Sequence, residues 1–193
     1  GNSKNIVCPI HRWTYALDGK LLGAPHFTQN PCLNLDKTPL QNWNGLLFNG
    51  RRKVVQDMAK LSVLKDFDFS NYMLDRIQVD QYRCNWKTFV EVYLEDYHVE
   101  PYHPGLGHFV DINNLSWECS DWYSAQVVGV NPRFDRAGSP IYEKWHQQVL
   151  RYNDNQHPPH GAIWLVYYPN IMLEWYPHTL IVSTIIPTGI ESC

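Results

Sequence analysis

The 193 residues carry a net charge of -3 and are 44% hydrophobic and 18% charged, which is typical of one or two globular domains and excludes disorder throughout. Basic residues do not cluster beyond a short run at residues 51–53, so we expect neither nucleic acid nor an anionic membrane as a partner. The apolar runs at residues 162–168 and 179–187 are shorter than the roughly 18 residues that span a bilayer, which predicts a soluble chain.

The first part of the chain, residues 1–50, has a β-like pattern. Short segments rich in apolar and aromatic residues predict strands, and Asp18-Gly19 predicts a hairpin turn between two of them. The mixed stretch at residues 51–64 shows no clean periodicity and is interpreted as a connection to a second block. We therefore place a domain boundary near residue 50.

The second part, residues 51–193, combines helix and strand patterns. Residues 79–97 predict a helix that ends at Pro101, and residues 141–152 predict an amphipathic helix. Segments rich in β-branched and aromatic residues predict antiparallel strands at 125–130, 162–168, 171–176 and 180–186. The predicted fold class is α+β.

The cysteines indicate the cellular location of the chain, and the aromatic residues indicate the kind of core or cavity it forms. Five widely separated cysteines with no secretion signal before them do not make a disulfide framework, so we expect a reducing, cytoplasmic location. An aromatic content of 14% indicates an aromatic core or a cavity for an organic ligand.

Cys8 and His11 form a C-x-x-H motif. A thiolate beside an imidazole is a pair of metal ligands, and a Rieske cluster is held by two cysteines on one iron and two histidines on the other. By itself the motif also fits a buried cysteine near a surface histidine. Residues 8–25, CPIHRWTYALDGKLLGAP, closely resemble the second half of the Rieske motif in the α-subunits of Rieske non-haem iron oxygenases. The resemblance implies that Cys8 and His11 hold a [2Fe–2S] cluster, whose first C-x-H pair would precede this chain.

His98 and His103 lie five positions apart. Two imidazoles and one carboxylate are the ligands of non-haem Fe(II) oxygenases, although an arbitrary pair at this spacing is more often at the surface. Residues 85–104, NWKTFVEVYLEDYHVEPYHP, resemble the mononuclear-iron motif of the same family. This implies His98 and His103 as iron ligands, Glu95 as the bridging carboxylate and Asn85 as a polar residue close to the iron. On the predicted helix, Glu95 lies one turn from His98.

The third iron ligand of the family, an Asp on a late helix, has no matching position here. Four carboxylates of the chain lie in sequence surroundings that do not match the family motif, so none of them is proposed as the third ligand: Asp111, Glu118, Asp121 and Glu174. The other histidines are interpreted as turn or surface residues: His26, His108, His146, His157, His160 and His178.

The resemblance implies a partial Rieske domain at residues 1–50 and part of a helix-grip, antiparallel-sheet catalytic domain at residues 51–193. The implied activity is O2 activation at a mononuclear Fe(II) to hydroxylate or demethylate a small organic substrate. Electrons would come from NAD(P)H through a separate reductase, with or without a ferredoxin, since the chain has no dinucleotide fingerprint. A homotrimer is implied, in which Glu95 meets His11 of the next subunit. A helix-grip module that binds small molecules without metal and an inactive remnant stay open as alternatives.

Overall fold

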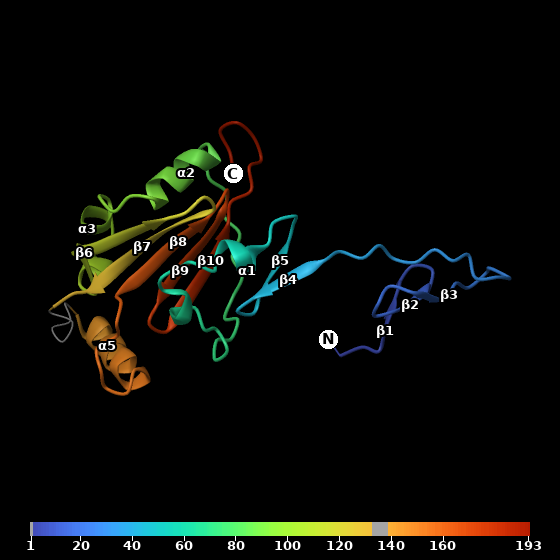
Figure 1. The fold of residues 1–193 in the computed structure, drawn as a ribbon, viewed down its shortest axis with the longest axis horizontal. Helices are drawn as coiled ribbons and strands as arrows, with labels where there is room; N and C mark the ends of the chain where they lie inside the picture. Colours follow the sequence, from blue (N-terminus) through green and yellow to red (C-terminus); the bar gives the residue numbers. More distant parts are fainter. Residues whose placement is uncertain (1, 133–138) are drawn as a thin grey trace. The chain divides into compact units, whose positions relative to one another are not determined.

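The computed structural model describes residues 2–132 and 139–193. Two compact units divide the chain, Gly1–Val54 and Val55–Cys193 (Figure 1). The assignment of residues 1–50 to a Rieske domain and of residues 51–193 to a catalytic domain stays a prediction. In the described part of the chain, no helix is long and apolar enough to cross a membrane.

The first unit consists of short antiparallel strands. Its sheets are a three-stranded one of order β1-β2-β3 and the β4-β5 hairpin. The predicted turn at Asp18-Gly19 joins β2 to β3, and Gly19 has a φ of 88°, a conformation that glycine adopts without strain. The strands are β1 (Asn5–Val7), β2 (Thr14–Ala16), β3 (Leu21–Gly23), β4 (Leu40–Trp43) and β5 (Leu46–Asn49).

The β4-β5 hairpin was not predicted, although its turn carries a clear signal. Asn44 and Gly45 join the strands with φ angles of 51° and 92°. Asn-Gly is the preferred pair where both central residues of a two-residue hairpin need a positive φ. The signal was therefore present in the sequence.

The second unit is built on a five-stranded antiparallel sheet of order β10-β9-β8-β7-β6. This arrangement confirms the predicted α+β class and the four predicted antiparallel strands. Strand β6 was missed. The strands are β6 (Val110–Cys119), β7 (Tyr123–Val130), β8 (Ala162–Tyr167), β9 (Ile171–Tyr176) and β10 (Thr179–Thr184).

Helices α2 and α3 lie along one face of this sheet (Figure 1). Val90 of α2 packs with Val166 of β8 and Met172 of β9, whereas Val99 of α3 joins a second cluster with Trp164. The helices are α1 (Val54–Asp57), the 3-10 helix η1 (Leu64–Asp66), α2 (Trp86–Tyr93), α3 (Val99–Tyr102), α4 (Pro104–Gly107) and α5 (Pro140–Tyr152).

One row of side chains crosses the sheet beneath these helices. Gln126 of β7 is opposite Trp164 of β8, which is opposite Glu174 of β9. Residues directly opposite each other project from the same face of a sheet. The opposite face is covered by the segment before α2, to which Tyr167 is tied by a hydrogen bond from its hydroxyl to Asp57 (2.6 Å).

The long helix predicted at residues 79–97 is wrong. Helix α2 begins at Trp86 and ends at Tyr93, and Pro101 lies inside the separate helix α3. Glu95 stabilises the turn after α2, because its carboxylate accepts the backbone N–H groups of Tyr97 (2.5 Å) and His98 (3.3 Å). A side chain that satisfies nearby backbone donors stabilises a turn at the expense of a helix. Glu95 and His98 are therefore neighbours across a turn and do not share a helix face.

Candidate functional site

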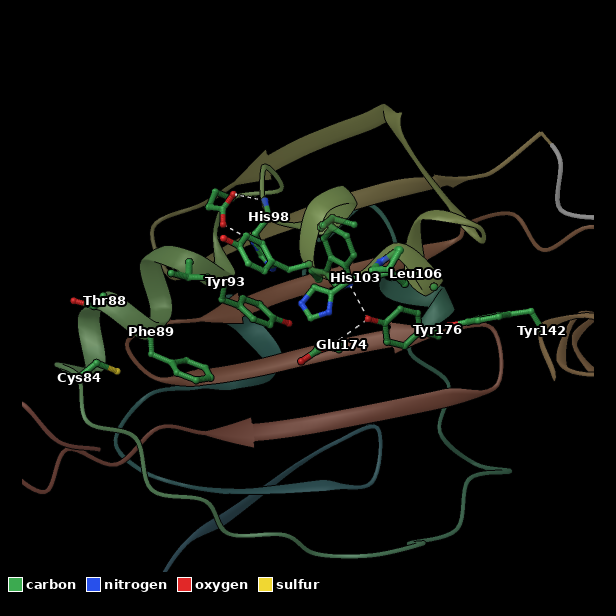
Figure 2. A pocket seen from close by; sticks show the side chains of 17 residues that line it. Cys84, Thr88, Phe89, Tyr93, His98, His103, Leu106, Tyr142, Glu174 and Tyr176 are labelled. Atoms are coloured by element: carbon green, nitrogen blue, oxygen red, sulfur yellow. Dashed lines mark hydrogen bonds and ion pairs between the residues drawn. The ribbon is translucent and has the colours of Figure 1, made fainter. Parts of the chain in front are cut away.

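A cleft of about 850 Å³ lies over the sheet, between strands β8 and β9 and helices α2 to α4 (Figure 2). Cavities that bind small molecules commonly measure about 300–1,000 Å³. Several aromatic residues line the wall, among them Tyr93, Trp164 and Tyr176. Its polar side chains include both predicted iron ligands.

His98 and His103 both line this cleft, and their ring centroids are 5.3 Å apart. The one-turn helix α3 separates them: His98 precedes its first residue and His103 follows its last. Val99 of the same turn is buried in the core and anchors the segment. The structure thus brings the two predicted ligands to one wall of the cleft.

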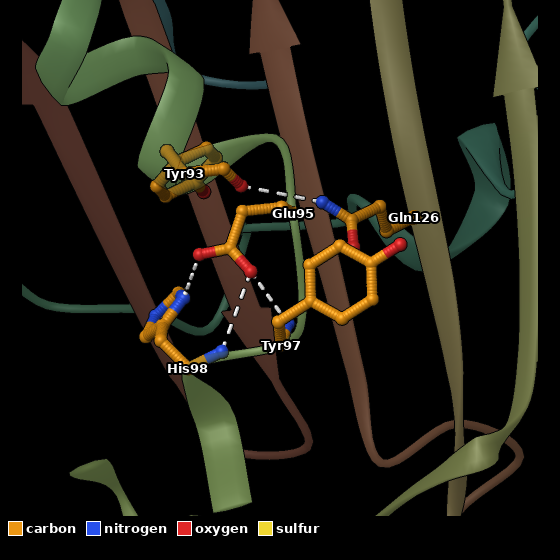
Figure 3. Close-up of polar contacts among 5 residues, drawn as sticks. All are labelled: Tyr93, Glu95, Tyr97, His98 and Gln126. Carbon is orange, nitrogen blue, oxygen red and sulfur yellow. Dashed lines mark hydrogen bonds and ion pairs between the residues drawn. The ribbon is translucent and has the colours of Figure 1, made fainter. Parts of the chain in front are cut away.

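Glu95 supports His98 through both its ring and its backbone. The carboxylate contacts Nδ1 of the ring as well as the backbone N–H (Figure 3). Nε2 is then the nitrogen left to face a ligand, which is the usual arrangement of a metal-bound histidine held by a carboxylate. Nearby, Gln126 donates from Nε2 to the backbone carbonyl of Tyr93 (3.2 Å) and so ties the end of α2 to the sheet.

The described side chains supply two of the three ligands of a non-haem iron site. His98 and His103 supply the imidazoles. Among residues 2–132 and 139–193, no group of three histidine, cysteine or carboxylate side chains is arranged to hold a metal ion. Asp111, Glu118, Asp121 and Glu174 therefore do not complete the set in this structure.

Asn85 lies outside the residues that line the cleft. It caps helix α2, where its side-chain oxygen accepts from the backbone N–H of Lys87 (2.9 Å). Its side-chain nitrogen donates to the carbonyl of Ile190 (2.7 Å). These contacts give Asn85 a clear structural role.

Cys8 and His11 lie in the turn between β1 and β2 of the first unit. The carbonyl of Cys8 accepts from the backbone N–H of Arg12 (3.0 Å), which closes the turn. Backbone hydrogen bonds from His11 and then Ile10 to the sulfur lower the pKa of the Cys8 thiol. A stabilised thiolate suits a cluster ligand. His11 is exposed.

Glu174 and Tyr176 line the cleft, and the sequence analysis gave neither of them a role. Burial raises the pKa of Glu174, and a hydrogen bond from Tyr176 opposes this only in part. Burial and the charge of Glu174 raise the pKa of Tyr93 well above its usual range. The available signal was a single acidic residue in an otherwise apolar strand.

The interpretation of His146 as a turn or surface residue is wrong. Its exposed fraction is 3%, and its ring lies among the rings of Phe109, Tyr142 and Trp145. Helix α5 has a buried side and an exposed side, so the prediction of a helix did not by itself show on which side His146 lies.

Comparison with known proteins identifies the family to which the chain belongs. Residues 61–193 match the model of the ring hydroxylating alpha subunit (catalytic domain). The putrescine 2-hydroxylase of Ralstonia nicotianae is 58% identical over 189 residues, 98% of this chain and 52% of the relative. That of Bordetella bronchiseptica is 52% identical over 183 residues, 95% of this chain and 43% of the relative. The carnitine monooxygenase oxygenase subunit of Acinetobacter pittii is 30% identical over 131 residues, 58% of this chain and 34% of the relative.

Solved structures show the same fold. The quaternary ammonium Rieske monooxygenase CntA in complex with an inhibitor matches with a TM-score of 0.71 at 18% identity, over 98% of this chain and 50% of that one. Naphthalene 1,2-dioxygenase with indole bound in the active site matches with a TM-score of 0.66 at 16% identity, over 100% of this chain and 52% of that one. The chain spans about half the length of the two putrescine 2-hydroxylases. The chain belongs to the Rieske non-haem iron oxygenase family, with residues 61–193 in the catalytic domain of its ring-hydroxylating α-subunit.

Proposed function

We propose that this chain is part of an oxygenase component that hydroxylates a small aliphatic amine, with putrescine as the first candidate. The observation that carries the proposal is the pair of histidines, with ring centroids 5.3 Å apart, on the wall of a cleft large enough for an organic substrate. The identity of 58% to a putrescine 2-hydroxylase along nearly the whole chain supports the choice of substrate. Demethylation of a methylated amine is the alternative reaction, and it is supported by the lower identity of 30% to a carnitine monooxygenase oxygenase subunit.

His98 and His103 would hold a mononuclear Fe(II), together with a carboxylate outside the residues described. When bound, this iron would supply O2 activation, so that one oxygen atom enters a C–H bond and the other leaves as water with two electrons and two protons. The residues of the chain perform the remaining tasks. Glu95 fixes the ring of His98 through Nδ1, and the aromatic wall excludes water and positions the carbon chain.

Cys8 and His11 would supply half of the ligands of a Rieske [2Fe–2S] cluster. The electrons would come from NAD(P)H through a separate reductase, with or without a ferredoxin. A separate reductase is needed because the chain has no dinucleotide fingerprint. In a homotrimer, Glu95 would link the iron of one subunit to His11 of the next. One solved structure of a quaternary ammonium Rieske monooxygenase is described in terms of inter-subunit electron transfer. All five cysteines are free thiols, which supports a cytoplasmic location.

The test uses the full-length protein, purified without oxygen and supplied with a reductase and putrescine under 18O2. We expect one 18O atom in a hydroxylated product and no product from the His103→Ala variant. Binding of putrescine by wild-type protein with no oxygen incorporation would overturn the proposal in favour of a metal-free binding module.

A further inference from the structure

Glu174 places a carboxylate in the cleft, and no lysine or arginine among the described residues forms an ion pair with it. Its side chain is half-buried on β9 and points into the cleft (Figure 2). Neither lysine nor arginine occurs among the described lining residues. In the described part of the chain, the ion pairs join His98 to Glu95 and His160 to Asp66 and do not include Glu174.

A hydrogen-bond relay sets the orientation of this carboxylate. The indole N–H of Trp164 donates to the hydroxyl oxygen of Tyr176 (3.2 Å), and that hydroxyl donates to Glu174 Oε2 (3.2 Å). An ionised carboxylate has about four acceptor positions, so several remain for a ligand. Trp164 and Tyr176 are thus committed as donors, and they hold Glu174 in place on the floor of the cleft.

Aromatic rings surround the same space. Tyr93, Trp164 and Tyr176 all line the cleft with Glu174, and the hydroxyl of Tyr93 is already bonded to the carbonyl of Leu173 (3.1 Å). Ring faces attract a cation through their quadrupole, and more strongly where water is excluded. A carboxylate among aromatic rings matches an organic cation better than it matches a neutral arene.

We propose that Glu174, with the rings of Tyr93, Trp164 and Tyr176, binds a primary ammonium group of the substrate and thereby selects which carbon faces His98 and His103. The inference rests on the proposed function and deepens it from an amine to a primary amine. A primary ammonium carries N–H donors that a carboxylate can accept, whereas a quaternary ammonium has none and is held by ring faces alone. Glu174 therefore favours the former.

The partial burial of Glu174 is consistent with this role. Burial raises the pKa of its carboxyl group, because removal from water disfavours the charged form. A bound ammonium would reverse that effect and would satisfy acceptor positions that the described side chains leave open. Substrate binding and ionisation of Glu174 then support each other.

The experiment compares full-length wild type with Glu174→Gln, which keeps the size of the side chain and an acceptor for Tyr176 but removes the charge. The probes are putrescine and its bis(trimethylammonium) analogue, which has the same carbon chain and no N–H. Anaerobic calorimetry should show putrescine binding weakened by about 10- to 100-fold in the variant, as expected for loss of a charge-assisted hydrogen bond. The preference for putrescine over the analogue should fall in parallel, and the hydroxylated carbon should change or become mixed.

Glu91→Gln is the matched control, because Glu91 is exposed on α2 and does not line the cleft. It should leave the dissociation constant within about twofold of wild type. Glu174→Asp, which keeps the charge, should bind putrescine more tightly than Glu174→Gln and provides a second reading if the Gln variant is poorly folded. Equal putrescine affinity and regiochemistry in wild type and Glu174→Gln, with wild type still hydroxylating putrescine, would overturn the role of Glu174 alone. A wild type that binds no primary amine would overturn both this inference and the proposed function.

Discussion

The carboxylate of Glu95 contacts His98 twice, at Nδ1 of the ring and at the backbone N–H. The same carboxylate holds the turn that separates helix α2 from α3. Glu95 is therefore placed both to orient the ring of His98 and to stabilise the turn before α3. A glutamine here would offer one acceptor oxygen in place of two, so it could keep the backbone hydrogen bonds of the turn but not the negative charge.

Glu95→Gln in the full-length protein should leave the iron content and the fold unchanged and should slow electron transfer to the iron. We expect the rate of single-turnover cluster oxidation, with substrate and O2 present, to fall by about 10- to 100-fold. Glu91→Gln, on the exposed side of α2, is the control. Cluster oxidation and product formation at the wild-type rate in Glu95→Gln would return Glu95 to a purely structural role.

The iron ligands make a separate prediction. His103→Ala in the full-length protein should lower bound iron by at least about tenfold while the visible absorption of the Rieske cluster persists, because the two centres use different ligands. The residual site should prefer Zn(II), which N and O donors bind more tightly than Fe(II). Metal analysis of His108→Ala provides the control, since His108 is exposed and does not line the cleft. Retention of a full complement of iron by His103→Ala would remove His103 from the ligand set.

Most of the sheet could be predicted because β8 is an unbroken run of apolar and aromatic residues and β9 is interrupted only by Glu174. Strand β6 could not, since its middle carries Asn113 and Asn114 and its register shifts between Asp111 and Leu115. Polar residues at a bulge hide the alternation on which strand prediction depends.

Some residues of the site could likewise be predicted from the sequence, and others could not. His98 and His103 are close in the sequence, so a local motif could mark them. Glu174 lines the same cleft only because the fold brings β9 and the segment around α3 to that cleft, and no local sequence pattern encodes this arrangement. The predicted helical stacking of Glu95 and His98 failed because a side chain, not a helix, satisfies the backbone at this turn.

Asn85 should act through helix α2 rather than through the metal. Asn85→Ala removes the oxygen that caps Lys87 and should lower the free energy of unfolding by about 1 kcal/mol. Asn85→Asp keeps a capping oxygen and should lose less, since only the bond to Ile190 is removed. Denaturation curves and iron analysis of both variants check this. A loss of iron in Asn85→Asp at wild-type stability would instead place Asn85 at the metal.

Glu118 predicts an acid-sensitive contact on β6. It accepts from the hydroxyl of Tyr123 (2.6 Å) and from the backbone N–H of Ser62 (3.0 Å). Burial raises the pKa of Glu118, but the hydrogen bonds from the Ser62 hydroxyl, from Tyr123 and from the Ser62 backbone together outweigh burial and hold the pKa below its usual range. The stabilisation is therefore present above the unfolded-state pKa of about 4.3 and is lost as the pH falls below it.

Tyr123→Phe should accordingly cost on the order of 1 kcal/mol at pH 7. The difference from wild type should shrink at an acidic pH below the lowered pKa of Glu118, where the carboxylate becomes protonated in the folded protein as well. Urea denaturation at the two pH values measures it. A difference that does not change with pH would show that the contact does not depend on the charge of Glu118.

Gly161 tests how closely the strands beneath the site approach one another. A Cβ atom placed there would lie 2.3 Å from the carbonyl oxygen of Gly129 and 3.3 Å from Cα of Val110, both of them backbone atoms that cannot rotate away. Gly161→Ala should therefore destabilise the second unit by about 1–3 kcal/mol and lower its melting temperature by about 3–10 °C. Gly107→Ala is the matched control, because nothing lies within 4 Å of a Cβ at that helical position. Thermal unfolding followed by circular dichroism compares the two. Equal melting temperatures would mean that β7 and β8 can separate at Gly161 without loss of packing around Ala162 and Trp164.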